Sequence, residues 1–410
     1  MMGVTMKPPD TEERQGPRRR SGAPAALPDG AAPLFVAGGL WAAIAMAMWL
    51  LALGGAIEIP GPLTPLDWHV HELLYGFVPA IAVGYMMTMV ANWSGHLPVH
   101  GTPRALLLAL WLAGRLALLS APPNGFALAA VIDVAFLLVA WVLVAREAIV
   151  GRDRRAVRLL SPLAVLLVGN AFFHWQAIEE VSPATGMPTR LGVAAAVMLI
   201  SLVGGLLVPS FTRRWLLDNG RPTLARPLPL LETATNWGSA VALLAWAVTP
   251  AHPGSGVLLV GAGLLQLARW LQWRPWRTLR EPLVLALQVG YGFLPAGFLM
   301  LGFGALAPDF GWPRHGDAVH AWTAGAVGTC MLSMMIRVAL RRARLPAHAD
   351  VATTTMLGAV MGAGLLRSIG GLDYEFAVGL AAGGWIAAFA GYVLVFGPML
   401  SAPPPARRAD

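Results

Sequence analysis

The chain has 410 residues, of which 57% are hydrophobic and 12% are charged. A soluble domain usually carries about 25% charged residues, so this composition excludes a soluble globular enzyme and indicates an integral membrane protein. The net charge of +8 does not indicate nucleic-acid binding, because the arginines lie in short loops between apolar segments. Loop arginines of this kind set the orientation of membrane helices. The single cysteine, Cys330, excludes a disulfide framework.

Apolar segments of about 20 residues recur along the chain, each long enough to cross the roughly 30 Å hydrocarbon layer of a bilayer. They predict an all-α fold, a polytopic transmembrane bundle of about twelve helices. In chain order the predicted helices cover residues 33–57, 68–91, 103–120, 125–149, 159–178, 189–211, 230–250, 254–273, 282–307, 316–340, 350–371 and 374–398. We expect one helical domain over 31–400, a disordered cytoplasmic tail at 1–30 and a short cytoplasmic tail at 401–410.

The loops between these helices alternate in charge. One set is rich in arginine, as around Arg154 and Arg342, whereas the other set carries acidic residues such as Glu179, Asp309 and Asp317. An excess of arginine marks the cytoplasmic side of a membrane protein. We therefore expect both termini to be cytoplasmic and the acidic loops to lie on the outer face.

The most informative stretch of the sequence runs from Asp67 to Gly95. It opens with His69, His71 and Glu72 and continues as an apolar run that can cross the bilayer. Asp67 is a suitable N-cap, because its carboxylate can accept the free backbone N–H groups of the first helical turn. Ionisable groups inside a membrane helix cost on the order of several kcal/mol, so they are usually paired or bind a ligand.

Four of the nine histidines fall at one predicted depth, near the outer ends of their helices: His69, His71, His174 and His320. Helices that converge at one depth can share a metal or haem site inside a bundle. Neutral imidazole is a good ligand for iron, copper and zinc. The four are therefore the candidate metal ligands, and the alternative for each is an ordinary core or headgroup-level histidine.

Helix geometry separates His69 from His71. The two are about 200° apart around an ideal helix, so they face opposite ways. Either the helix begins between them, or they belong to two separate sites. Glu72 lies one turn from His69 and can orient its second ring nitrogen. Asn170 lies one turn from His174 and can hydrogen-bond to it.

Three further charged residues are expected in the same outer half of the bundle. Arg115 and Asp133 come at similar depths in successive predicted helices and can form an ion pair. Arg367 has a planar guanidinium that suits an acidic side chain or a haem propionate.

A long motif opens the second predicted helix. It consists of Trp68, His69, His71, Glu72, Leu74, Tyr75, Gly76 and Phe77, followed by Thr88 and by Asn92 to Gly95. With later matches over 111–115, 170–174, 276–282 and 320–329, this pattern resembles the NnrS family of polytopic bacterial membrane proteins. The resemblance implies haem and copper as cofactors and nitric oxide as the small-molecule partner. It also implies a multi-pass protein of the bacterial inner membrane, with a role in nitric oxide metabolism or resistance.

The sequence departs from the family pattern at three places. Leu206 and Gln288 stand where an arginine and a histidine are usual, and Arg341-Arg342 replaces a glycine–histidine pair. The four outer histidines are retained. The resemblance leaves open whether the protein reduces nitric oxide, binds it or protects iron centres from it.

Two other functions fit the sequence. A proton-coupled secondary transporter could use Glu72 and Asp133 as proton carriers, but no convincing internal repeat supports it and no charges lie at the predicted midplane. A structural or assembly role is the third option.

Overall fold

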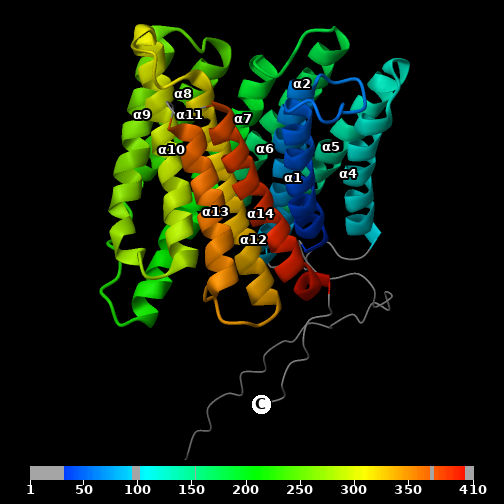
Figure 1. Cartoon of the computed structure of the whole chain (residues 1–410). Helices are drawn as coiled ribbons and strands as arrows, with labels where there is room; N and C mark the ends of the chain where they lie inside the picture. The colour runs from blue at the N-terminus through cyan, green and yellow to red at the C-terminus, as the bar shows by residue number, and fades with distance from the viewer. Residues whose placement is uncertain (1–31, 95–101, 153, 370–373, 402–410) are drawn as a thin grey trace, which may run out of the picture.

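The structure, a computed structural model, describes residues 32–94, 102–152, 154–369 and 374–401. Within these residues every regular element is a helix, as predicted (Figure 1). The long helices are α1 (Ala32–Leu53), α3 (Val78–Ser94), α4 (Thr102–Ser120), α5 (Phe126–Val150), α6 (Arg154–Ile178), α7 (Met187–Asp218), α8 (Pro229–Val248), α9 (Pro253–Gln272), α10 (Pro282–Leu306), α12 (Thr329–Arg342), α13 (Val351–Ser368) and α14 (Tyr374–Ser401). The short elements are α2 (Pro65–His71), α11 (His315–His320), the π-helices η1 (Glu72–Phe77) and η5 (Ala321–Gly328), and the 3₁₀ turns η2 (Pro123–Gly125), η3 (Pro275–Thr278) and η4 (Pro308–Phe310).

Joined end to end, α2, η1 and α3 form one rod, and α11, η5 and α12 form another. The described residues therefore make twelve rods, which confirms the predicted number. Ten of these are long and apolar enough to cross a membrane, so the chain is a multi-pass membrane protein. The two that are not among the ten are α8 and α13, which pack along the more apolar α9 and α14.

The rods are arranged around a centre formed by α7, α10 and the α11–η5–α12 rod. α10 contacts α7, α12 and η5, and α7 contacts α6 on its other side. The successive helices α4, α5 and α6 form one wing of the bundle, and α8 and α9 form the other (Figure 1). α1 and α14 pack against each other, and α1 also contacts η1 and α3.

The ends of the rods place the candidate site. The start of α1 and the end of α14 lie at one end of the bundle, whereas α2 and α11 lie at the opposite end (Figure 1). His69, His71 and His320 therefore share a depth, as predicted. The expected tails, residues 1–30 and 401–410, lie outside the described residues except for Ser401, which still belongs to α14. α7 continues to Asp218, about two turns beyond its predicted end at 211.

A buried polar network holds α8 and α9 to the centre. Arg269 of α9, which is 2% exposed, forms a close ion pair with Glu232 of α8 and donates to the Tyr291 hydroxyl at 3.0 Å. Gln266 donates to Ser201 of α7 at 2.8 Å and accepts from Tyr291 at 2.7 Å. These bonds satisfy polar groups for which the membrane offers no water.

Candidate functional site

Six polar side chains meet inside the bundle, near the end that carries α2. We call them the inner polar cluster. Its members are His71 of α2, Glu72 of η1, Arg115 of α4, Asp133 of α5, and Asn170 and His174 of α6. None is more than 3% exposed, so each depends on the others for its hydrogen bonds.

Arg115 is the guanidinium of the cluster, and it joins two carboxylates. Its Nη1 lies 2.7 Å from Oε2 of Glu72, and its Nη2 forms a close ion pair with Oδ1 of Asp133. The predicted pairing of Arg115 with Asp133 is confirmed. Trp41 of α1 also donates its indole N–H to Oε2 of Glu72 at 2.6 Å. Charge-assisted bonds of this kind are stronger than neutral ones.

Asp133 lies between the two histidines. Its Oδ2 accepts a hydrogen bond from Nδ2 of Asn170 at 2.8 Å and lies 2.9 Å from Nε2 of His174 and 3.2 Å from Nε2 of His71. One donor atom from each of His71, Asp133 and His174 lies within 4.8 Å of the other two. Two imidazole nitrogens and a carboxylate oxygen form a donor set suited to copper, zinc or iron.

Both ring nitrogens of His71 face hydrogen-bond acceptors. Nδ1 lies 3.0 Å from Oε1 of Glu72, and Nε2 lies 3.1 Å from Oδ1 of Asn170. With neutral histidines, the two carboxylates and the Arg115 guanidinium leave the cluster one positive charge short. An unbalanced charge is costly in a buried site. A second proton on His71 or a bound cation would balance this charge.

The local backbone allows this close packing. α2 ends at His71, and the π-helix η1 follows at once. Such π segments occur mostly as single turns inside α-helices, frequently at functional sites. Gly76 of η1 leaves room for Arg115, because a Cβ at this glycine would collide with the guanidinium. The carbonyl of Gly76 also accepts the indole N–H of Trp111 at 2.9 Å.

His69 lies in different surroundings, with residues that we call the second histidine group: Trp49, His69, His320 and Arg367. The His69 ring stacks on Trp49 of α1 with 4.5 Å between ring centroids. It is within electrostatic range of His320 of α11 and Arg367 of α13. Its Nδ1 is buried without a hydrogen-bond partner. Nδ1 of His320 lies 2.7 Å from the carbonyl oxygen of Gly316 and donates to it, which leaves Nε2 as an acceptor.

The structure thus separates the four predicted ligands into two pairs. His71 and His174 belong to the inner polar cluster, and His69 and His320 belong to the second histidine group. Because α2 is helical through both His69 and His71, the idea that the helix begins between them is wrong. The two histidines face two different sites. That these sites hold metals stays a prediction.

The predicted N-cap at Asp67 is wrong. The helix begins earlier, at Pro65, and Thr64 is the N-cap whose side chain accepts the backbone N–H of Asp67. Asp67 accepts hydrogen bonds from the Ser182 hydroxyl at 2.7 Å and from the backbone N–H of Ala184 at 3.0 Å. It therefore fastens the start of α2 to the loop after α6.

Two supporting residues have other partners than predicted. Glu72 orients His71, its neighbour in sequence, and not His69. Asn170 hydrogen-bonds to His71 and Asp133, and not to His174. The Glu72 carboxylate contacts His71 and Arg115, and the Asn170 amide contacts His71 and Asp133.

Sequence reasoning missed the ligand role of one member of the inner polar cluster and missed one hydrogen-bond donor to it. Asp133 was expected as an ion-pair partner of Arg115 and not as a candidate ligand, although a carboxylate inside an apolar run is a signal of function. Trp41, which donates to Glu72, carries no such signal, because tryptophan is common in membrane helices and their borders.

Fold and site together define a class: a multi-pass α-helical membrane protein with a buried centre of imidazoles, carboxylates and a guanidinium. The family model described as NnrS protein matches residues 29–403, nearly the whole chain. The chain belongs to the NnrS family. Among curated proteins, none matches it.

Proposed function

We propose that this protein is a copper- and haem-containing protein of the bacterial inner membrane that acts on nitric oxide, in its metabolism or in resistance to it. The observation that carries the proposal is the convergence of His71, Asp133 and His174, whose donor atoms lie within 4.8 Å of one another in the bundle interior. The family of the chain supports the choice of cofactors.

The inner polar cluster fits a single copper ion. Its donor atoms are close enough for one ion, and the helices around them are packed too tightly for a macrocycle. A monovalent copper ion would supply the one positive charge that the cluster lacks. Glu72 would hold the Nδ1–H of His71 so that Nε2 points at the ion, as carboxylates do for ligating histidines.

The second histidine group has the residues that a haem needs. His320 donates through Nδ1 to the Gly316 carbonyl, so its Nε2 would be the nitrogen that holds a haem iron. His69 offers a buried ring nitrogen without a partner. Arg367 has the planar guanidinium that suits a propionate. When bound, a haem supplies an iron that coordinates diatomic gases.

Nitric oxide is small and uncharged, so it dissolves in the bilayer and reaches a buried centre without a polar channel. The contribution of the protein is to hold the two centres at one depth. His69 and His71 are two residues apart on α2, which joins the second histidine group to the inner polar cluster.

A visible absorption spectrum of the purified protein, after expression with sufficient haem, tests this function. We expect a Soret band in the wild type and its loss or shift in His320→Ala. His252→Asn is the matched control, because His252 is an exposed N-cap of α9 and asparagine also caps helices. A wild type without a Soret band would contradict the haem assignment.

One observation also favours a proton-coupled transporter as a second candidate. The positive charge that the cluster lacks can be a proton on His71, and a buried group that gains and loses a proton can couple to transport. Purified protein in vesicles with an imposed pH gradient discriminates the two. Proton movement through a metal-free protein, abolished in Asp133→Asn, supports the transporter and contradicts the copper site.

A further inference from the structure

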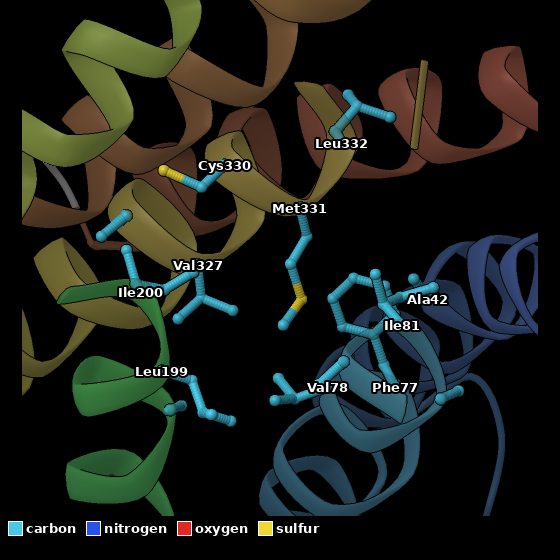
Figure 2. Close-up of a cluster of buried hydrophobic side chains, with 14 of the residues drawn as sticks. Ala42, Phe77, Val78, Ile81, Leu199, Ile200, Val327, Cys330, Met331 and Leu332 are labelled. Atoms are coloured by element: carbon cyan, nitrogen blue, oxygen red, sulfur yellow. The ribbon is translucent and has the colours of Figure 1, made fainter. Parts of the chain in front are cut away.

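A cavity of about 70 Å³ lies between α1, α3, α7, α10 and α12, away from both histidine sites. The surface that lines it is apolar, and Tyr85 and Cys330 are the two lining residues whose side chains carry a polar group. Figure 2 shows part of this wall, with Met331 of α12 extending between Leu199 of α7 and Ile81 of α3. A cavity of this kind stays dry and accepts apolar occupants.

The lining of the cavity includes fully buried and half-buried side chains. Phe35 and Val208 are fully buried in its wall. Tyr85, Leu207 and Met334 also line it but are half-buried. A hydrocarbon chain from the surrounding membrane can therefore reach the interior past these three side chains.

An arginine with unsatisfied N–H groups lies next to the cavity. Arg337 is one turn beyond Met334 on α12, and its guanidinium lies 4.2 Å from the ring centroid of Phe211 on α7. Phe211 is itself one turn beyond Leu207, which lines the cavity. Nε and Nη2 of Arg337 are buried without a hydrogen-bond partner. Unsatisfied buried donors are costly, so this guanidinium favours a ligand that brings an acceptor.

One carboxylate close enough to interact electrostatically with Arg337 forms its own contacts elsewhere. Glu281 is within electrostatic range of it. The Glu281 carboxylate, however, accepts from the backbone N–H of Leu283 at 3.3 Å and lies 3.5 Å from Nδ1 of His348. It is therefore engaged at the start of α10.

The same end of the bundle is basic. Arg213 and Arg214 follow Phe211 on α7, and Arg341 and Arg342 end α12. Basic pockets between membrane helices at headgroup level bind anionic lipid headgroups. The cavity and the arginines beside it match the two parts of an anionic lipid. The cavity suits the hydrocarbon tail, and the arginines suit the charged headgroup.

We propose that this place binds an anionic phospholipid. One acyl chain enters the cavity past Met334, and the phosphate accepts hydrogen bonds from Nε and Nη2 of Arg337. A free fatty acid has the same two chemical parts, so the test must separate the two. The site is independent of the copper and haem proposal, since it shares no residue with either histidine site.

Native mass spectrometry of the full chain, delipidated in mild detergent and then titrated with lipid, tests the proposal. The probes are phosphatidylglycerol, phosphatidylcholine with the same chains, and oleate. We expect phosphatidylglycerol to bind most tightly, and Arg337→Gln to weaken its binding about fivefold to tenfold. Arg214→Gln is the matched control, because Arg214 is at the same end but its side chain is 78% exposed. We expect the affinity of this variant for phosphatidylglycerol to equal that of the wild type.

A second variant tests the tail independently of the charge. Ala82 lines the cavity, so Ala82→Phe fills it and should weaken phosphatidylglycerol binding by a similar factor. Ala387→Phe adds the same volume at an exposed position of α14 and should leave phosphatidylglycerol binding unchanged. Unchanged binding in Arg337→Gln and Ala82→Phe overturns the site. Equal binding of phosphatidylcholine overturns the role of Arg337, and binding of oleate alone shows that the occupant is a fatty acid.

Discussion

Arg115 is the residue on which the inner polar cluster depends most. It contacts both carboxylates, Glu72 and Asp133, and it is the one guanidinium among the six side chains. Removing a partner from a buried ion pair leaves an uncompensated charge, which costs more than the pair itself contributes. The number of unpaired charges that a substitution leaves in this cluster therefore predicts how strongly it destabilises the protein.

Arg115→Gln should be the most destabilising change, by about 3–5 kcal/mol, because it leaves two carboxylates facing each other. Asp133→Asn should cost less, because Glu72 and Arg115 then balance. Arg214→Gln, which breaks an exposed pair with Asp218, should cost about 1 kcal/mol or less. Unfolding of each purified variant in detergent measures the order. An Asp133→Asn variant less stable than Arg115→Gln would show that the charge count is wrong.

At the residue scale the sequence predicts which groups are buried and charged, but not which of them meet. His71, His174, Arg115 and Asp133 stand out because ionisable side chains are rare in apolar helices. The direction of each side chain depends on how its helix is rotated about its own axis. The spacing of apolar residues does not determine this rotation when every face of the helix is apolar. For this reason Glu72 and Asn170 were given the wrong partners.

At the scale of elements, the two π-helices are the main feature that the sequence did not predict. Each begins directly after a histidine that ends a short helix, His71 before η1 and His320 before η5. A π segment adds a residue to one helical turn. The residues after it therefore point in other directions than an uninterrupted α-helix would give them. No residue type marks such an insertion, and a straight helix was therefore expected at both places.

Gly364 tests the packing that supports the second histidine group. A Cβ at Gly364 of α13 would lie 2.5 Å from the Cα of Gly325 in η5, so Gly364→Ala should push α13 away from η5 and cost about 1–3 kcal/mol. Gly358 on the same helix has open space around its Cβ position, so Gly358→Ala should be neutral or stabilise by up to about 1 kcal/mol. Thermal unfolding of both variants makes the comparison; similar losses would contradict the close approach.

The cap of α13 predicts a dependence on pH. Asp350 accepts the backbone N–H of Thr353 at 2.8 Å, and this hydrogen bond holds the pKa of Asp350 below its ordinary value. The lowered pKa means that the cap stabilises the fold above about pH 4 and that this stabilisation is lost as the pH falls through the folded-state pKa. Asp350→Asn keeps the cap without the charge, so its unfolding temperature should fall less between about pH 5 and pH 3 than that of the wild type. Equal falls would contradict this role of the carboxylate.

At the scale of the whole molecule, the number of helices follows from the sequence. Each rod needs a long apolar run to cross the bilayer, and loops with arginine or acidic residues separate the runs. α8 and α13, which are not among the ten helices apolar enough to cross a membrane, were also predicted from their apolar segments, and the alternation of loop charge supports the count independently. The described helices determine which loops lie at the same end of the bundle. The charge of those loops then predicts which end faces the cytoplasm.

Reporter fusions test this orientation. We expect fusions in the loops around Arg154 and Arg342 to report from the cytoplasm, and a fusion near Asp309 to report from the outside. Loops rich in arginine resist transfer across the membrane, which is the physical reason for the assignment. A cytoplasmic signal near Asp309 would place both histidine sites on the other face.

The central claim is that copper and haem occupy two separate sites on the two faces of α2. The most direct measurement is the copper and haem content per protein of His174→Ala and His320→Ala, purified at matched expression beside His252→Asn. His174 belongs to the inner polar cluster and His320 to the second histidine group, so we expect the first variant to lose copper and keep haem, and the second to lose haem and keep copper. If each variant keeps both cofactors, or if either single change removes both from a stably folded protein, the two-site account is contradicted.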